Sequence, residues 1–359
     1  MGDLMTGFSS YKILESQYGN FIIPALKIKV NGSDVIKTMG LIVEEISVTL
    51  SVRLAGMAVF KIAGLYQEKN HSFRSDVKDK FKPGTVVEVE LGYLSATQKV
   101  FKGYVAMVGA EFGGNPLYVV TLMDARRLMM TSGKKQVLYD VKNYSDAVKT
   151  VLGSYSKLCS PVIDATSDSL DKPVSQMTND FDFITKELIH TGKTDREFFI
   201  IGDKAYFRKP QSVKMPMLNV EYGRELYSLK VDFSYLDLQV DVIGYNPKEQ
   251  ERIEASQKAA GCLSQVRLIS QTPVLSVADA DADSAEKAKI RAEALAREQE
   301  EKACAGSGST FGLPELIPGR YLQVEALEAM LNKKYYITEV THVMNSENYM
   351  TYFEIGGAG

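Results

Sequence analysis

The chain contains one short pattern twice, and this repetition limits the folds it can adopt. Residues 83–90 read PGTVVEVE and residues 318–325 read PGRYLQVE, so proline, glycine, valine and glutamate occupy matching places. Proline followed by glycine favours a tight turn, and the alternating residues after it favour a strand. Strand-like segments follow both copies, with GYV at 103–105 and YYI at 335–337 in corresponding places. The order predicts a duplicated antiparallel meander, although any simple meander of strands would reproduce part of it.

Residues 20–130 alternate between apolar and polar side chains, as strands with one buried face do. The segment around residues 45–52 places Ile46, Val48 and Leu50 on one face. Asn31 and Gly32 form the dipeptide that best fits a type I′ hairpin turn. Six or seven short strands with polar turns indicate a barrel or sandwich, and we expect the first β-barrel domain in residues 20–130.

Residues 131–215 have a different pattern, which predicts a small α+β domain. The segment NYSDAVKTVLGSYSKL has apolar residues at helical spacing and a capping residue at Asn143 or Ser145. TNDFDFITKELIHTG predicts a second helix that ends at Gly192. A hairpin that turns at Gly202-Asp203 follows.

Strand-like alternation returns in residues 216–245 and 313–359, which we assign to a second β-barrel domain. Residues 246–312 between them are polar and alanine-rich, and Asp283 to Glu286 resemble a helix-capping box. We expect a helical and loop insertion with too little apolar surface for its own core. Residues 1–19 form an N-terminal segment. The predicted fold class is α+β, mainly β, with two similar antiparallel barrels, an inserted small α+β module and a helical insertion in the second barrel.

Composition excludes several classes of function. The formal net charge of −3 and the pI near 5.8 provide no basic field for nucleic acid. The longest apolar runs fall far short of the roughly 20 residues that a spanning helix needs, so we expect no membrane anchor. The N-terminus lacks the pattern of a signal peptide. Three scattered cysteines, Cys159, Cys262 and Cys304, predict reduced thiols in a protein made in the cytoplasm.

The sequence offers no recognisable catalytic or ligand-binding pattern. Its three histidines, His71, His190 and His342, lie outside any HExxH or paired-cysteine arrangement, and His342 is expected to make a structural hydrogen bond in a strand. GxSxG, P-loop and GxGxxG patterns are missing. The aspartates at 279–283 imitate half of a calcium loop, but Ser284 and Ile290 occupy its sixth and twelfth positions. We therefore predict no catalytic, cofactor-binding or metal-binding residues, no cofactor, and no enzymatic activity.

Several longer segments, taken in order, resemble the phage late control protein D family, the tail hubs related to the N-terminal part of VgrG. They are FKGYVAMVGAEF with YVVTLMDARRLM, NYSDAVKTVLGSY, TNDFDFITKELIHTGKTDREFFIIGDKAYF, SAEKAKIRAEALAREQEEKACAG, and IPGRYLQVEAL with KKYYITEVTHVMNSENYMTYFEI. Each segment alone is a weak match to the family, but the order of all of them together is specific. The resemblance covers about residues 20–357 and implies two tail-tube-like barrels with an intervening α+β module, in agreement with the repeat.

The resemblance also implies a function. It predicts a structural baseplate hub of a contractile tail, in a phage, a tailocin or another contractile injection system, assembled in the bacterial cytoplasm. Its homotrimer would place six barrels between the six-fold tail tube and the three-fold spike. Expected partners are the tail tube protein, the tape measure, other baseplate proteins such as LysM-type ones, and a spike that is a separate chain. The alternatives are a tail-associated cell-wall hydrolase and a β-rich adhesin.

Overall fold

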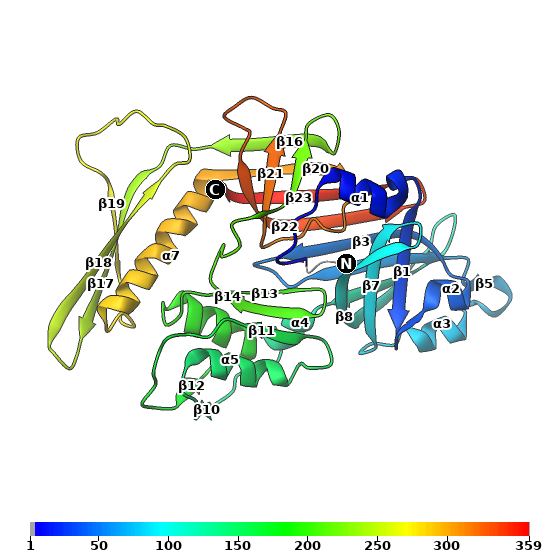
Figure 1. Ribbon diagram of the computed structural model, residues 1–359. Helices are drawn as coiled ribbons and strands as arrows, with labels where there is room; N and C mark the ends of the chain where they lie inside the picture. The colour runs from blue at the N-terminus through cyan, green and yellow to red at the C-terminus, as the bar shows by residue number, and fades with distance from the viewer. Residues whose placement is uncertain (1–3, 359) are drawn as a thin grey trace.

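The computed structural model describes residues 4–358, and most of its strands belong to one large sheet (Figure 1). The strands contributed by the N-terminal part are β1 (Pro24–Val30), β2 (Ser33–Asp34), β3 (Ile42–Ser51), β4 (Met57–Ala63), β7 (Val86–Tyr93), β8 (Ala96–Glu111) and β9 (Leu117–Met123). The strands contributed by the C-terminal part are β15 (Pro216–Glu221), β16 (Leu226–Phe233), β20 (Cys304–Phe311), β21 (Tyr321–Glu325), β22 (Lys334–Asn345) and β23 (Tyr349–Ala358).

The two parts repeat the same strand order. The first repeat pairs in the order β1-β7-β8-β9-β4-β3, and the second repeat pairs in the order β15-β21-β22-β23-β20-β16. All pairings correspond in sense except the first, because β1 is antiparallel to β7 whereas β15 is parallel to β21. The duplicated meander inferred from the sequence is therefore present as a duplicated strand order.

The repeated Pro-Gly pair makes the same backbone hydrogen bonds in both repeats. The Gly84 N–H donates to the Val105 carbonyl at 2.8 Å, and the Gly319 N–H donates to the Ile337 carbonyl at 2.8 Å. Both glycines have φ in the left-handed region, at 90° and 83°, which favours glycine at this position. The residue after each glycine accepts in return, from the N–H of Val105 or Ile337. The motif thus fixes the start of β7 or β21 against the middle of β8 or β22.

Neither repeat is a closed barrel, in contrast to the prediction. Among residues 4–358 no ladder joins β1 to β3 or β15 to β16. The edge of β3 that closure would need pairs instead with β22, residue by residue from Glu45 with Asn345 to Ser51 with Glu339. This pairing merges the repeats into a 13-stranded sheet (Figure 1).

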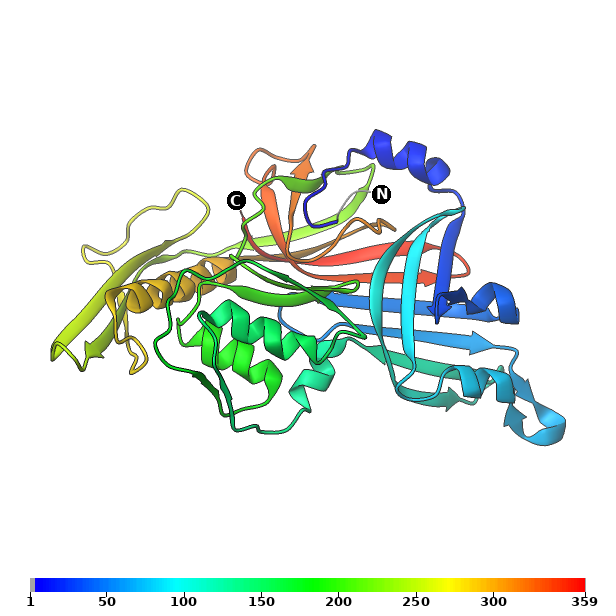
Figure 2. The same cartoon turned by 60° about the horizontal axis from the view of Figure 1, so that its bottom comes forward.

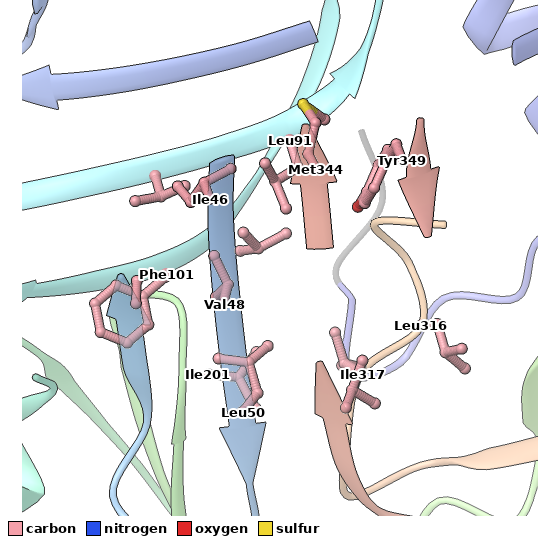
Figure 3. Packing of buried hydrophobic residues seen from close by; sticks show 14 of the residues in the cluster. Ile46, Val48, Leu50, Leu91, Phe101, Ile201, Leu316, Ile317, Met344 and Tyr349 are labelled. Atoms are coloured by element: carbon pink, nitrogen blue, oxygen red, sulfur yellow. The ribbon is translucent and has the colours of Figure 1, made fainter. Parts of the chain in front are cut away.

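The repeats also share one hydrophobic core on one side of the sheet. Figure 3 shows buried side chains of the first repeat, including Ile46 and Leu91, in the same cluster as Met344, Tyr349 and Ile317 of the second repeat. Continuous burial across the β3–β22 junction means that neither repeat has a core of its own. We therefore expect the two repeats to unfold together.

Short elements lie around the large sheet, and the helix that carries Ala125 and Met129 packs into the core of the middle α+β module. They are α1 (Tyr11–Tyr18), α2 (Val35–Met39), α3 (Ser75–Lys80), α4 (Ala125–Met130), the small strands β5 (Tyr66–Gln67) and β6 (Ser72–Phe73), and the 3₁₀ turns η1 (Gly19–Phe21) and η2 (Glu68–Asn70). The Asn31-Gly32 turn joins β1 to β2 with both residues at positive φ, as the sequence predicted for a type I′ hairpin. From α1, the Tyr18 hydroxyl reaches the Glu315 carboxylate at 2.6 Å, which connects the N-terminal segment to the second repeat.

The middle α+β module packs below the sheet and contacts both repeats (Figures 1 and 2). It consists of β10 (Val137–Tyr139), α5 (Tyr144–Gly153), β11 (Ser160–Ile163), β12 (Val174–Gln176), α6 (Asp180–Asp182), the π-helix η3 (Phe183–His190), β13 (Glu197–Ile201) and β14 (Lys204–Arg208). Asn143 caps α5 by accepting the Asp146 N–H at 2.9 Å, and the β13–β14 hairpin turns at Gly202, both as predicted.

Two contacts attach this module to the sheet. The Asp203 carboxylate binds the Lys99 ammonium of the first repeat at 3.1 Å. The Glu197 carboxylate accepts from the Tyr336 hydroxyl of the second repeat at 2.8 Å. Burial raises the pKa of Glu197, and the Arg208 guanidinium, 2.8 Å away, opposes that rise. The module therefore bridges the two repeats.

The insertion differs from the prediction in its boundaries and in its core. The predicted barrel residues 237–245 lie in β17 (Asp237–Asn246), which forms a separate sheet with β18 (Glu251–Ala260) and β19 (Val274–Ala278). Helix α7 (Ala285–Ala303), capped by Ser284, packs on this sheet over small cores of valine and alanine side chains. At Gly244 a Cβ would come within 1.9 Å of the Ala282 carbonyl oxygen. The insertion therefore builds its core from closely packed small side chains rather than from large apolar ones. The insertion projects from one end of the body (Figure 1).

Candidate protein interface

The face of the large sheet opposite the core is polar. In β3 the core-facing Ile46, Val48 and Leu50 are fully buried, and the residues between them point to the other face. Strand register extends this face across the β3–β22 junction. We call it the polar face. Its polar members are Glu45, Ser47, Thr49, Lys61, Thr121, Glu339, Thr341, Tyr352, Glu354, Ser307, Ser309, Ser228, Lys230 and Asp232, and the same register also places Met57, Val59, Val119, Met123, Val343 and Met350 on it.

Short polar contacts hold neighbouring strands together on this face. The Thr49 and Thr341 hydroxyls are 3.1 Å apart across the junction between the repeats. The Ser228 and Ser309 hydroxyls are 2.6 Å apart at the far edge. Hydroxyl pairs of this kind stabilise directly opposed positions of antiparallel strands. These serine and threonine side chains stay close to the sheet.

Acidic side chains add charge to the same face. Glu339 and Glu354 are direct cross-strand neighbours, and they line a hollow of about 230 Å³ together with Ser228, Ser307 and Tyr352. Burial raises the pKa of Glu339, and the neighbouring Glu354 carboxylate raises it further. A hollow lined by hydroxyl groups and like-charged carboxylates offers hydrogen-bonding groups, and it holds no histidine or cysteine to act with them.

The three histidines named in the sequence analysis lie in three different environments. His342 is fully buried in β22, where its Nδ1 lies 3.0 Å from the Thr351 hydroxyl and 3.1 Å from the Tyr349 hydroxyl. Burial lowers the pKa of His342 to about 3, so the ring is neutral and structural, as the sequence predicted. His190 lies 3.1 Å from the Arg291 guanidinium of the insertion, and His71 is exposed in a loop.

The structure brings no metal-binding cluster together within residues 4–358, where no group of three or more His, Cys, Asp or Glu side chains could hold an ion. Cys159, Cys262 and Cys304 are free thiols in this part of the chain. Burial raises the pKa of Cys159 to about 12, and burial together with nearby Cys262 raises the pKa of Cys304 to about 12. High thiol pKa values make Cys159 and Cys304 poor nucleophiles. No helix of residues 4–358 has the length and apolarity to cross a membrane.

Two of the unpaired strand edges of the large sheet belong to β16 and to β8. β16 is the last strand of the sheet and pairs only with β20. β8 pairs with β7 through its first part, up to Tyr104, and its second part pairs only with β9. Unpaired edges expose backbone N–H and C=O groups that another strand can bind. Sequence reasoning did not identify these edges, because edge position depends on which distant strands pair.

Comparison with solved structures defines the fold class. The chain resembles a tail protein from Neisseria meningitidis MC58, with a TM-score of 0.68 and 11% identity over 93% of this chain and 96% of that chain. It resembles the 43 kDa tail protein of prophage MuSo2 from Shewanella oneidensis, with a TM-score of 0.67 and 9% identity over 93% and 98%. An E. coli type VI secretion component, itself described as similar to bacteriophage T4 tail proteins, gives 0.58 and 12% over 93% and 77%. The chain therefore has a tail-protein fold.

At the level of sequence, the family model described as the Alg8 N-terminal domain matches residues 22–346. The chain belongs to this family. None of the curated protein sequences matches it. The tail-protein fold expected from the sequence is confirmed, whereas membership of the late control protein D family stays a prediction.

Proposed function

We propose that the protein is a structural hub of a contractile tail, whether of a phage, a tailocin or another injection particle. The observation that carries the proposal is the internal repeat: two units with the same strand order lie in one continuous sheet. The tail-protein fold of the whole chain supports the same class of particle.

The internal repeat allows a trimer of this chain to match a six-fold ring. A tail tube is built of six-fold rings and a spike is three-fold, so a connector must present both symmetries. Three copies of a chain with two similar repeats give six similar units around one axis. Such a ring meets a hexamer through its repeats and a trimer through features that occur once per chain. The middle module and the insertion occur once per chain and are suited to the three-fold contacts.

The polar face is suited to line the bore of this ring. Its threonine and serine pairs stay close to the backbone, and its opposite side is the shared core. Hydroxyl groups and charges on this face stay hydrated, and most of its apolar side chains, such as Val59 and Val343, are only partly exposed. The partners we propose are the tube protein, a separate spike chain, the tape measure and other baseplate proteins, LysM-type ones included. Its role is structural rather than catalytic, and its place is the baseplate of the particle.

Copy number in purified particles tests this proposal. Quantitative mass spectrometry of particles should give one copy of this chain for every two tube subunits of a single ring, and the same number of copies as the spike chain. Deletion of the gene should leave particles without a joined spike and tube. Intact particles after deletion, or peptidoglycan cleavage by the purified chain, would contradict the hub proposal and favour the tail-associated hydrolase.

A further inference from the structure

We propose that β16 of one copy pairs with the second part of β8 of a neighbouring copy, in the register that β3 and β22 use within one chain. The partner is thus a second copy of this protein. The inference rests on the proposed ring and specifies the surface that closes it. It follows from three observations: a junction inside the chain, its repetition in register, and two open edges.

The junction inside the chain is the antiparallel pairing of β3 with β22. Ser47 lies opposite Val343, Val48 opposite His342, and Leu50 opposite Val340. This is the place where the first repeat meets the second. A ring of similar repeats needs an equivalent place where the second repeat meets the first repeat of the next copy.

The equivalent of β3 is β16, and the register is fixed by a matching irregularity. The β3–β4 ladder shifts between Val43 and Glu45, and the β16–β20 ladder shifts between Leu226 and Ser228. Counting from these shifts, Ile46, Val48 and Leu50 correspond to Leu229, Val231 and Phe233. Both sets are the inward-facing apolar residues of their strands.

The equivalent of β22 is β8, and here too an irregularity fixes the register. The β8–β9 ladder shifts between Val105 and Met107, and the β22–β23 ladder shifts between Ile337 and Glu339. The repeated Pro-Gly hydrogen bonds give the same alignment, because they reach Val105 in one repeat and Ile337 in the other. Val340, His342 and Val343 therefore correspond to Val108, Ala110 and Glu111.

Both edges that this correspondence selects are unpaired. The part of β22 that binds β3 corresponds to the second part of β8, which has no partner on that side among the described residues. Burial agrees: Val48 and Leu50 are fully buried, whereas the corresponding Val231 and Phe233 are only half-buried. Met107 in the open part of β8 is 61% exposed. Both edges thus lack the cover that their counterparts receive.

The transferred register brings compatible side chains together. Phe233 would lie opposite Val108, Val231 opposite Ala110, and Lys230 opposite Glu111. The first two pairs point to the core side and the third to the polar face, in keeping with strand alternation. The Lys230 side chain is 76% exposed and the Glu111 side chain 54% exposed, so both are available to form an ion pair between copies.

Disulfide trapping tests the register directly. Lys230→Cys and Glu111→Cys are combined in one chain and expressed with the complete particle. Directly opposite positions have Cβ atoms about 5 Å apart, within reach of a disulfide after small adjustment. Purified particles should yield covalent multimers up to three chains without reductant. The control pairs Lys230→Cys with Met107→Cys, which faces the same side four residues away.

The proposal is overturned if the control pair forms multimers as readily as the test pair, or if the test pair stays monomeric in particles that contain three copies. The second result leaves the hub function intact and rejects only this interface. Absence of the chain from particles rejects both. The three native cysteines could form disulfides of their own. The wild-type chain and each single variant are therefore run in parallel as controls.

Charge reversal gives an independent readout. Lys230→Glu should reduce incorporation into particles roughly five-fold, because it places like charges directly opposite one another. Glu111→Lys should do the same, and the double reversal should restore incorporation. Within its own chain Glu111 also contacts Lys61 at 3.3 Å, and Lys230 lies 3.7 Å from Asp232. Each single variant alone is therefore ambiguous, and rescue in the double variant is decisive. Additive loss in the double variant would overturn the pairing.

Discussion

The two repeats share a strand order but differ at their edges. In the first repeat β3 has a neighbour on each side, β4 and β22, and its core-facing Ile46, Val48 and Leu50 are fully buried. In the second repeat β16 has one neighbour, and its corresponding residues are half-buried. The strand pairing inside each repeat is preserved, and the repeats differ at the edge strand, which pairs with β22 in the first repeat and is open in the second. The chain thus has a continuous hydrophobic core, but β16 has a strand partner on one side only.

The repeats also differ in how they fill equivalent space. In the first repeat Phe60 lies on β4 and pairs with Val120 of β9. In the second repeat glycine, Gly308, takes the place of Phe60, and Phe353 takes the place of Val120. A Cβ at Gly308 would lie 2.3 Å from the Phe353 ring, so the large side chain comes from one strand in one repeat and from the neighbouring strand in the other. One buried aromatic ring is kept at this place, while the strand that carries it changes.

Removal of either aromatic ring should give the largest effect on the isolated chain. We expect Phe60→Ala and Phe353→Ala each to lower the free energy of unfolding by about 3–5 kcal/mol, because each ring is buried in the shared core. Denaturant titration followed by circular dichroism should show one transition that both variants shift. Phe112→Ala, at a 65% exposed position, is the control. Two transitions, each sensitive to only one variant, would show that the repeats fold separately.

The two Pro-Gly turns should differ in their tolerance of a side chain. Gly84→Ala costs about 1–2 kcal/mol, because the residue keeps a left-handed φ in open space. Gly319→Ala should cost more, because a Cβ there would also lie 2.8 Å from the Phe199 ring of the middle module. Midpoints of thermal unfolding measure the difference. Equal losses would mean that the module does not press on the second turn.

Acid stability should depend on His342, which has no counterpart in the first repeat, where Ala110 takes its place. The pKa of this buried ring is lowered to about 3, against about 6.5 in an unfolded chain. The unfolded state therefore binds a proton that the folded state does not, and stability falls as pH decreases from about 6.5 towards 3. His342→Asn should flatten this part of the stability curve, although the substitution itself lowers stability at pH 7.

Exposed His71 provides the matched control, because His71→Asn should leave the shape of the curve unchanged. Unfolding midpoints in urea at half-unit steps between pH 7 and 4 make the comparison. The same slope for wild type and His342→Asn would contradict a neutral, buried ring.

The smallest expected effect concerns the polar face. Burial and the Glu354 carboxylate raise the pKa of Glu339, so its charged form is less favourable in the folded protein than in the unfolded chain. Stability from this group is gained as pH falls through the raised pKa and lost above it. Glu339→Gln should raise the melting temperature slightly at pH 7 and leave it unchanged near pH 4. A lower melting temperature at pH 7 would mean that the carboxylate makes a stabilising contact.

Sequence patterns predicted what is local. The Pro-Gly turns, the Asn31-Gly32 hairpin and the cap at Asn143 all depend on residues a few positions apart, and all are present. The predicted boundaries of the insertion, 246 and 312, differ from the structure at both ends, for opposite reasons. The residues of β17 alternate as a barrel strand would, although they build a separate sheet. The glycines and serines of β20 resemble a linker, although β20 lies in the large sheet.

Close approach explains the composition of β20. A Cβ at Gly306 would lie 2.2 Å from the Lys230 carbonyl oxygen, and a Cβ at Gly308 would meet Phe353. Glycine is therefore required by neighbours that are distant in sequence, and local propensity gives no sign of it. The polar face and the open edges depend on the same long-range pairing, so the candidate interface emerged only from the structure.

The most direct test is an image of the assembled baseplate by electron cryomicroscopy, at a resolution that traces strands. We expect three copies of this chain around the axis, with six similar repeats forming one ring and the polar face towards the bore. Six copies of the chain in the ring, or a single copy away from the axis, would contradict it.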